Sequence, residues 1–498
     1  MSQSQISQEL AKTAPPDDSA APPNVPDLIR IGAIPTNLQM DIDTDILEPV
    51  VKSDSFIRYV LDKKGFLHSN SKLVFAMSSG DTAATGFFPL GIGVMSLIER
   101  ATLKVGNKTI NEIDDWNHYQ AYRSMFVSNE NNKERELCTT GRALCYDFAY
   151  NNASATLTGA LTAPALVGTG ESNTSAEKYQ IDVNRQVDAV LDRSGGANTN
   201  ITTLPDFVTT TNVADTAPEF QINLSDLFPF LKQNQLPLYM VDEQISIELR
   251  MSPMSQNERL CYSGGDTPFT NPSIDLTKCK LVADYVFYPT EIMAAYQQQN
   301  QDLTFTYMDY HLSKQGFTPD GTNETIIIRD VGGAGKICTK LIVSCAMKTA
   351  NPEEALLNQY VSNYPLQSSA TVNGSVVSNV RYNGEFLYPI DHTNPALQFH
   401  DVSQAEGSLP FITRTLFSGE GDDVTTDTFM GRASNTNLRR QFFRQAYRLN
   451  RNERINSRGI ELYNTFKVLQ NAAHTQRCWV ESVKVAHLRG GMLDCYDA

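Results

Sequence analysis

The sequence of 498 residues predicts a mainly β protein with short helices and long loops. Short runs rich in Val, Ile, Leu, Tyr, Phe and Thr recur along the chain, and Gly, Asn, Asp, Ser and Pro separate them, as expected for strands and turns. Helical patterns are few and brief, and long polar stretches separate several strand-like runs. The length allows two large β-sandwiches as well as three smaller domains, and either arrangement can bury its own core.

The first residues differ in composition from the rest of the chain. Up to about residue 30 they are rich in Ser, Gln, Ala and Pro, and they contain too few apolar side chains to fold alone. We assign residues 1–35 to an N-terminal arm. A disordered tail and an arm that becomes ordered on a neighbouring subunit both fit this composition, and the sequence alone favours the tail.

The strand-like runs begin after the arm. The segment Gln244–Arg250 alternates apolar and polar residues strictly, which predicts a strand with one face in a core and the other in water. The segment Val480–Val485 gives a weaker form of the same pattern. In chain order, the predicted strands are Lys72–Met77, Ser96–Val105, Gln244–Met251, Lys280–Tyr288, Thr325–Asp330, Ile337–Met347, Gly384–Tyr388, Gly459–Leu469 and Trp479–Leu488.

Two segments predict helices. Ile113–Phe126 is the first, with Asp114 or Asp115 as its N-terminal cap. Thr290–Gln299 is the second, with Thr290 as the cap and an acidic residue in the first turn. The second helix falls between two β-rich halves and therefore predicts a domain junction.

Long polar stretches occur at Thr162–Ala217 and Asn351–Ser378. Structureless connections of this length are uncommon in compact domains and usually carry a role of their own. We therefore expect long loops between paired β-sandwiches.

The charge and cysteine content exclude several classes of protein. The net formal charge is −15, without a long acidic block, which disfavours a protein that coats nucleic acid over its whole surface but allows one basic face. The best apolar segment, Phe87–Leu97, is too short to cross a bilayer, so no membrane span is expected. The eight cysteines form no C-x-x-C pair, and we expect most of them to be reduced, buried thiols.

Two glycine-rich segments resemble phosphate-binding motifs only superficially. Gly91–Ser96 lacks the third glycine of a dinucleotide fingerprint and leads into a strand-like run instead of a helix. Gly332–Lys336 has Asp330 where the first glycine of a phosphate loop belongs and Ile337 where Ser or Thr would hold magnesium, so we interpret it as a hairpin turn. Since the histidines are also scattered, we expect no catalytic residues, no metal site and no cofactor, and the chain is not expected to be an enzyme.

One basic region stands out between residues 432 and 458. Its arginines are interleaved with Phe442, Phe443 and Tyr447, a pattern that suits protein interfaces, where arginine and aromatic residues are enriched, and also nucleic-acid binding. We favour a subunit interface over a genome-facing surface. The candidate residues are Arg439, Arg440, Arg444, Arg448, Arg451 and Arg454.

Several segments, in their order and spacing along the chain, carry a resemblance to a known family. They are Lys64–Ser69 and the strand after it, Pro89–Gly93, Val105–Asn107, Asp114–Trp116, Asn223–Leu231, Leu236–Tyr239 with the strand Ile245–Leu249, Ala283–Tyr288 and Thr290–Glu291. Read together, they resemble the double jelly-roll major capsid proteins of polinton-like viruses, virophages and related nucleocytoplasmic large DNA viruses. The resemblance extends over about residues 36–300 and is looser in the second half, where the order of elements matches better than the residues.

The resemblance implies two consecutive eight-stranded jelly-roll β-sandwiches. It places the first jelly roll at residues 36–289, a junction helix at 290–300 and the second jelly roll at 301–498. It implies a homotrimer that tiles an icosahedral capsid shell of a double-stranded DNA virus with near-sixfold packing, in contact with neighbouring trimers and with penton or minor capsid proteins. Weak contact with packaged DNA is a further expectation.

The resemblance further implies that the chain is part of the virion and is made in the host cytoplasm or nucleus. Two alternatives remain. Jelly rolls also occur in lectins, which makes a carbohydrate- or receptor-binding β-sandwich protein one alternative. A minor (penton) capsid component with a single sandwich is the other.

Overall fold

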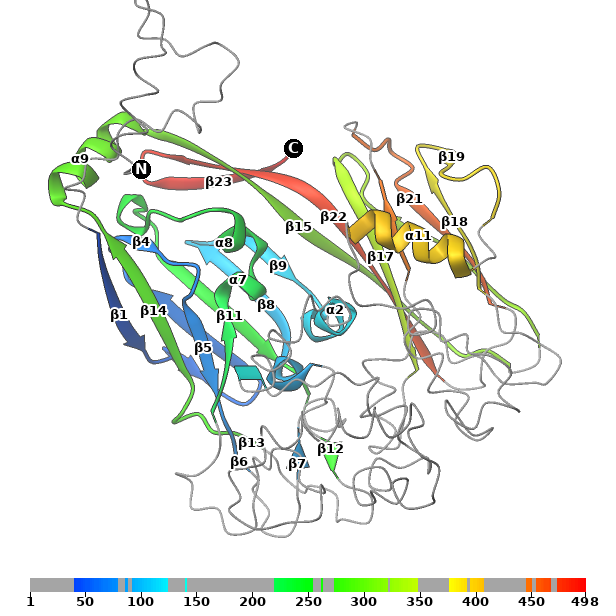
Figure 1. Ribbon diagram of the computed structural model, residues 1–498, viewed down its shortest axis with the longest axis horizontal. Coiled ribbons are helices and arrows are strands. Elements are labelled where there is room, and N and C mark those ends of the chain that lie inside the picture. The colour runs from blue at the N-terminus through cyan, green and yellow to red at the C-terminus, as the bar shows by residue number, and fades with distance from the viewer. Residues whose placement is uncertain are drawn as a thin grey trace, which may run out of the picture.

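The computed structural model contains two β-sandwiches, which lie side by side (Figure 1). The residues that it describes are 40–78, 86–87, 92–123, 139–140, 219–253, 261–262, 273–320, 323–347, 376–391, 395–406, 445–449, 454–466 and 473–498.

The first sandwich is built from strands that precede residue 290. Both of its sheets are antiparallel, and two short strands, β2 (Val51–Lys52) and β4 (Phe66–Leu67), extend them. One sheet has the order β1 (Asp41–Leu47), β14 (Lys280–Phe287), β5 (Lys72–Phe75) and β10 (Phe220–Asn223). The other has the order β3 (Phe56–Leu61), β11 (Ile245–Met251), β8 (Ile98–Val105) and β9 (Lys108–Ile113).

The second sandwich is built from strands that follow residue 300. Its sheets are also antiparallel, and β23 (Met492–Asp497) pairs with the end of β22. One sheet has the order β15 (Asp302–Phe317), β22 (His474–Arg489), β17 (Cys338–Met347) and β20 (Gln445–Arg448). The other has the order β16 (Thr325–Gly332), β21 (Ile460–Phe466), β18 (Val376–Tyr382) and β19 (Glu385–Phe386).

The two sandwiches share one topology. If the eight principal strands of each are counted in chain order, one sheet of each sandwich runs 1-8-3-6 and the other runs 2-7-4-5. This is the connectivity of a jelly roll, in which strands distant in sequence pair within two packed sheets. The predicted fold class of two consecutive eight-stranded jelly rolls is therefore confirmed.

Short helices lie at the ends of the sandwiches and between them. Helix α9 connects β14 to β15, and α2 lies between the two sandwiches (Figure 1). Two pairs of two-residue strands, β6 (Met77–Ser78) with β13 (Ser273–Ile274) and β7 (Gly86–Phe87) with β12 (Cys261–Tyr262), extend from the first sandwich. The helices in the described part of the chain are η1 (Gly93–Leu97), α2 (Trp116–Arg123), α7 (Leu224–Leu227), α8 (Pro229–Gln233), η4 (Leu238–Met240), α9 (Thr290–Gln299) and α11 (Pro395–Glu406).

The main apolar core continues from the first sandwich into the second. It contains the first sandwich's buried residues together with Tyr307, Ile342 and Trp479 of the second. A separate core fills the second sandwich and includes Cys478 and Val480. Strand β22 therefore contributes alternate residues to both cores.

Both predicted helices form, with different ends. Helix α2 starts at Trp116, because the residues up to Ile113 form strand β9. Helix α9 has the predicted bounds, but Thr290 is its first residue and Pro289 occupies the cap position without a side-chain hydrogen bond, so the predicted cap is wrong.

The nine predicted strands are all present, several of them with different bounds. The first ends at Phe75 and continues after Ala76 as β6, and the second starts at Ile98 because Gly93–Leu97 forms a 3-10 helix. The run predicted at residues 384–388 is a strand only over β19, whereas the last is longer than predicted. On β11 the apolar residues face the core, as the alternation predicts.

Some predictions lie outside the described residues. These include the arm at 1–35 and the stretch Thr162–Ala217; of the stretch Asn351–Ser378, the last three residues belong to β18. No helix in the described part of the chain is both long and apolar enough to cross a membrane.

Candidate functional site

The glycine-rich segment Gly332–Lys336 connects β16 to β17, and these strands belong to different sheets. It is therefore a turn from one sheet to the other, and the predicted hairpin is wrong. Gly332, Gly333 and Gly335 all have positive φ angles, of 95°, 85° and 77°, which favour glycine. Among the described residues, no group of three His, Cys, Asp or Glu side chains could hold a metal ion.

Five cysteines in the described part of the chain, Cys279, Cys338, Cys345, Cys478 and Cys495, are free thiols, and all of these but Cys495 are buried. Burial raises the pKa of Cys279, Cys338 and Cys478 to about 12. Such thiols are almost entirely protonated near neutral pH and are poor nucleophiles. For these residues the expected role as small buried apolar side chains is confirmed.

Two of the six candidate arginines are described, and both are exposed. Arg448 ends β20, the outermost strand of its sheet, and Arg454 follows shortly after. The adjacent residues hydrogen-bond to the start of β17 and the turn before it, since Leu449 N donates to Thr339 O and Ile455 N donates to Lys336 O. The other four, Arg439, Arg440, Arg444 and Arg451, lie outside the described residues.

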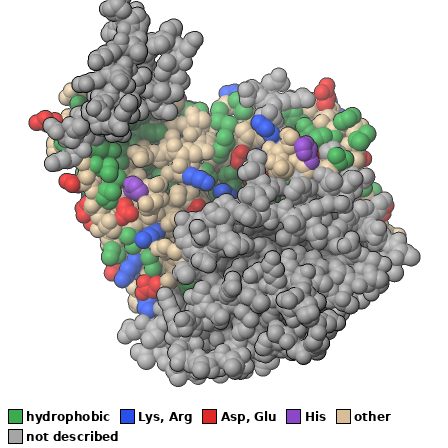
Figure 2. All heavy atoms as spheres, viewed as in Figure 1, with side chains coloured by type: hydrophobic (Ala, Val, Ile, Leu, Met, Phe, Trp, Pro, Cys, Tyr) green, Lys and Arg blue, Asp and Glu red, His purple; other side chains and the backbone are tan. Residues whose placement is uncertain are grey.

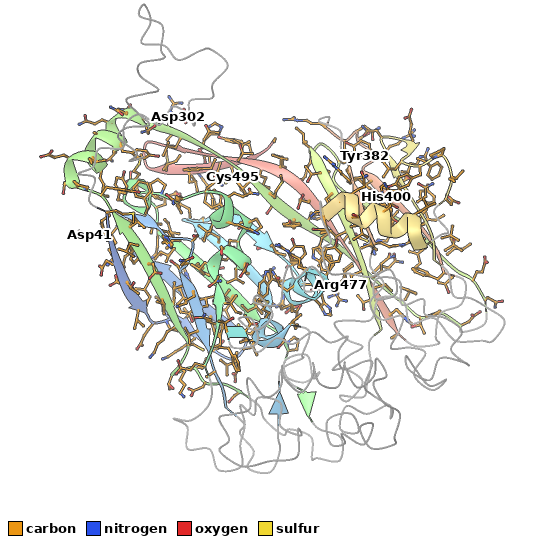
Figure 3. The ribbon with its side chains drawn as sticks, viewed as in Figure 1. Asp41, Asp302, Tyr382, His400, Arg477 and Cys495 are labelled. Carbon is orange, nitrogen blue, oxygen red and sulfur yellow. The ribbon has the colours of Figure 1, made fainter. Side chains whose placement is uncertain are left out.

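The most elaborate polar arrangement in the described part of the chain lies between the two sandwiches. Asp115, between β9 and α2, accepts a 2.6 Å hydrogen bond from Arg477 Nε of β22 and lies 2.8 Å from Lys314 Nζ of β15. Figure 3 places Arg477 between the two sandwiches. Burial alone would raise the pKa of Asp115, but Arg477, His118 and Lys314 outweigh it and hold the pKa well below its ordinary value.

A second polar cluster lies beside the first. Glu481 of β22 accepts hydrogen bonds from Tyr310 Oη (2.5 Å) and Thr339 Oγ1 (2.6 Å). Lys340 of β17 lies 3.5 Å from Glu481 and 3.1 Å from Glu406 at the end of α11. Burial would lower the pKa of Lys340, but the two carboxylates outweigh it and raise the pKa, so the lysine stays charged.

Helix α2 of the first sandwich completes this second cluster. Tyr122 Oη donates a 2.7 Å hydrogen bond to Glu406 Oε1. The ring of Tyr119 lies 4.9 Å from that of Tyr310 and 5.9 Å from that of Trp479, measured between centroids. Aromatic contacts therefore tie α2 to the facing sheet, and a charge-assisted hydrogen bond ties it to the end of α11.

A third group of contacts joins β9 to β15. Asn111 Nδ2 donates a 2.9 Å hydrogen bond to Asp309, whose other oxygen lies 2.6 Å from Lys484 Nζ. Tyr307 Oη donates a 2.7 Å hydrogen bond to the backbone oxygen of Ile110. Together the three groups form the junction, which we define as the contact of β9 and α2 with the end of α11 and with the outer face of the sheet that contains β15, β22 and β17.

Sequence reasoning did not find the junction. It assigned Asp114 or Asp115 only as the cap of a helix, because Arg477 is 362 residues away from Asp115 in the chain. Ionisable residues such as Arg477 and Glu481 are unusual within a strand that is buried on both faces. Their presence on β22 was the sequence signal from which the junction could have been inferred.

The strand order and the junction define a class of fold, the double jelly roll. No protein-family model matches the sequence, and neither does any curated protein. Several solved structures of viral capsid proteins are similar to it.

Among them is VP54 of the virus PBCV-1, from a crystal structure fitted into a reconstruction of the virophage Sputnik. It has a TM-score of 0.51 and 10% identity, over 93% of this chain and 97% of that one. A chain of the Sputnik virophage has a TM-score of 0.53 and 8% identity, over 92% and 88%. The major capsid protein of mavirus has a TM-score of 0.46 and 11% identity, over 97% and 96%.

Proposed function

We propose that this chain is a major capsid protein that self-assembles as pseudo-hexameric trimers into the icosahedral shell of a double-stranded DNA virus. The observation that carries the proposal is the repetition of one jelly-roll topology within a single chain. Similarity to VP54 and to a chain of the Sputnik virophage, over nine tenths of this chain, supports it through the fold.

The geometry suits a building block of a shell. Two sandwiches with the same strand order give three chains six similar walls, and closed cyclic symmetry lets such walls tile a surface with near-sixfold packing. Buried charged and aromatic contacts hold the two sandwiches of one chain as a single body. A rigid block with repeated side faces is what assembly from many copies requires.

The proposal assigns a role to each part of the chain. Residues 1–35 form an arm, 36–289 the first jelly roll, 290–300 the junction helix and 301–498 the second jelly roll. The trimer contacts neighbouring trimers and penton or minor capsid proteins within the virion, and the chain has a structural role without enzyme activity. We assign the basic cluster to a subunit interface, and the exposure of Arg448 and Arg454 fits this role.

Electron microscopy of the purified protein at increasing concentration tests the proposal. We expect three-lobed particles with six similar walls, which associate into sheets or closed shells with near-sixfold packing. Dispersed single chains that bind specifically to glycan supports would favour a carbohydrate-binding sandwich instead. Fivefold assemblies would favour a penton component.

A further inference from the structure

We propose that the second sandwich binds a cluster of ordered water molecules between its two sheets, held by Gln476, Asn464, Ser378 and Tyr447. We call these four side chains the polar layer. The inference goes beyond the proposed function, because it concerns the interior of one sandwich and does not depend on assembly.

The polar layer is buried. Its four side chains are 0% to 1% exposed. Figure 2 shows hydrophobic side chains on the surface of the second sandwich, towards the right end of the molecule, whereas these polar side chains lie inside it. Five of their atoms have no hydrogen-bond partner among the described residues: Gln476 Nε2 and Oε1, Asn464 Oδ1, Ser378 Oγ and Tyr447 Oη.

Strand register and contacts across the sandwich bring three of the four side chains together. Asn464 of β21 lies directly opposite Ser378 of β18. Asn464 Nδ2 donates a 3.3 Å hydrogen bond to Gln445 Oε1 of β20, and Tyr447 follows on the same face of β20. Burial raises the pKa of Tyr447 and nearby Ser378 partly offsets this rise, although the two hydroxyl groups are not in hydrogen-bonding geometry.

Gln476 lies at the same depth as Asn464. Strands β21 and β22 belong to opposite sheets, and β21 ends at Phe466 where β22 starts at His474. The ring of Phe317 stacks on both, with centroid distances of 6.1 Å to Phe466 and 5.4 Å to His474. Asn464 and Gln476 each lie two residues further into the sandwich on the same faces of their strands, so both belong to one layer.

Aromatic and apolar side chains enclose the polar layer. The stacked rings of Phe317, Phe466 and His474 lie towards the ends of the strands. On the other side, Leu462 of β21 and Cys478 of β22 belong to the core of the second sandwich. Because buried polar groups almost always have a partner, five unpaired atoms in one enclosed layer indicate a bound polar species.

The chemistry of the layer selects water over an ion. All four side chains are neutral, since burial raises the pKa of Tyr447 and keeps its hydroxyl group protonated. An anion requires donors and a cation requires acceptors, whereas the unpaired atoms comprise one amide donor, two amide acceptors and two hydroxyl groups that can do both. A buried water molecule makes about three hydrogen bonds, so these atoms suit about two water molecules.

The water cluster joins the two sheets of the second sandwich. Gln476 and Tyr447 belong to one sheet, and Asn464 and Ser378 belong to the other. Hydrogen bonds through water are nearly as favourable as direct ones. This end of the sandwich is therefore held partly through water, beside the direct hydrogen bond from Asn464 to Gln445.

Oxygen-17 magnetic relaxation dispersion of the purified full chain tests the inference, because it detects water molecules that stay inside a protein. Gln476→Met has a similar length and no hydrogen-bonding group, and we expect it to lose the signal of about one water molecule or more. Gln315 is exposed and lies opposite Gln476 on β15, so Gln315→Met is the matched control and should keep the full signal. Equal signals from Gln476→Met and the wild type would overturn the inference.

Thermal unfolding of the same variants gives a readout whose sign separates a hydrated layer from a dry one. If the amide of Gln476 binds water, Gln476→Met leaves that water without a partner and should lower the unfolding midpoint by about 2 °C or more. If the amide has no partner, the change removes an unpaired polar group. A raised or unchanged midpoint would therefore contradict the inference, and Gln315→Met should leave the midpoint unchanged.

A density map of the wild-type chain decides the matter if Gln476→Met does not fold. We expect separate density peaks within hydrogen-bonding distance of the amide groups of Gln476 and Asn464. Continuous density from another side chain, or no density between the polar atoms, would overturn the inference.

Discussion

Arg477 lies at the centre of the junction, where its side chain meets Asp115 in a contact that both residues bury. The carboxylate is held by Arg477 at 2.6 Å and by Lys314 at 2.8 Å, and Asp115 itself has a φ angle of 46°, in the left-handed region. Aspartate tolerates that region better than most residues. The local backbone and two cations from the other sandwich therefore fix one carboxylate.

Arg477→Gln should destabilise the folded chain by about 3 kcal/mol, since removal of one partner of a buried ion pair leaves the other charge buried. The free energy of unfolding in urea measures the loss. Arg489→Gln, at the exposed end of the same strand, is the matched control and should change stability by less than about 0.5 kcal/mol. Equal losses in the two variants would contradict the role of the ion pair.

Asp115→Asn should remove part of the acid sensitivity of the fold. Because the folded-state pKa of Asp115 is well below its ordinary value of about 3.9, its contribution to stability is present above that value and is lost as pH falls towards the folded pKa. The difference in unfolding free energy between wild type and variant should thus be largest above about pH 5 and shrink as the pH approaches 2. A difference that stays constant over this range would contradict the assignment.

For single residues, composition predicted the buried thiols, because cysteines without metal-binding spacing are commonly small buried side chains. It could not predict the ion pairs of the junction. Asp115 and Arg477 meet only when both sandwiches have folded, and neither residue carries a local signal of its partner.

Strand β22 shows why periodicity predicts some elements better than others. Cys478 and Val480 point into the core of the second sandwich, while Arg477, Trp479 and Glu481 face the first. A strand covered on both faces loses the simple alternation of apolar and polar residues. The position of β22 between the two sandwiches explains why apolar and polar residues alternate only weakly over Val480–Val485.

Strands β1, β3 and β15 were not among the predicted strands. β1 contains three aspartates and β15 contains Asp, Lys and Gly, residues that strands disfavour. Both form because they pair along their length with β14 and β22, over seven and sixteen residues. Pairing with distant strands overrides local preference in these two elements.

Gly65, in the turn between β3 and β4, tests how closely the elements of the first sandwich pack. Its φ angle is 57°, and a Cβ atom there would lie 2.6 Å from the backbone oxygen of Val286. Gly65→Ala should therefore destabilise the chain by about 2 kcal/mol or more beyond the conformational penalty. Thermal and urea unfolding measure the effect.

Gly490 provides the control for this change. Its φ angle is 55°, close to that of Gly65, but a Cβ atom there would have no heavy atom within 4 Å. Gly490→Ala should show only the penalty of the left-handed backbone, about 1 kcal/mol. Similar losses at the two positions would mean that the close approach to Val286 does not matter.

For the whole molecule, the residue patterns predicted a mainly β protein with two β-rich halves, and the resemblance to double jelly-roll capsid proteins predicted the repeated topology that the strand order confirms. The exposure of several large apolar side chains could not be predicted in this way. Ile42, Ile390 and Leu397 look like ordinary core residues in the sequence, and only the folded chain shows that they are exposed.

The solution mass of the purified chain tests the central claim most directly. Light scattering over a dilution series should give 165.9 kDa, three times the chain mass of 55.3 kDa, and the value should persist on dilution because the proposed contacts close a ring. A mass of 55.3 kDa at all concentrations would contradict the account of a trimeric capsid protein.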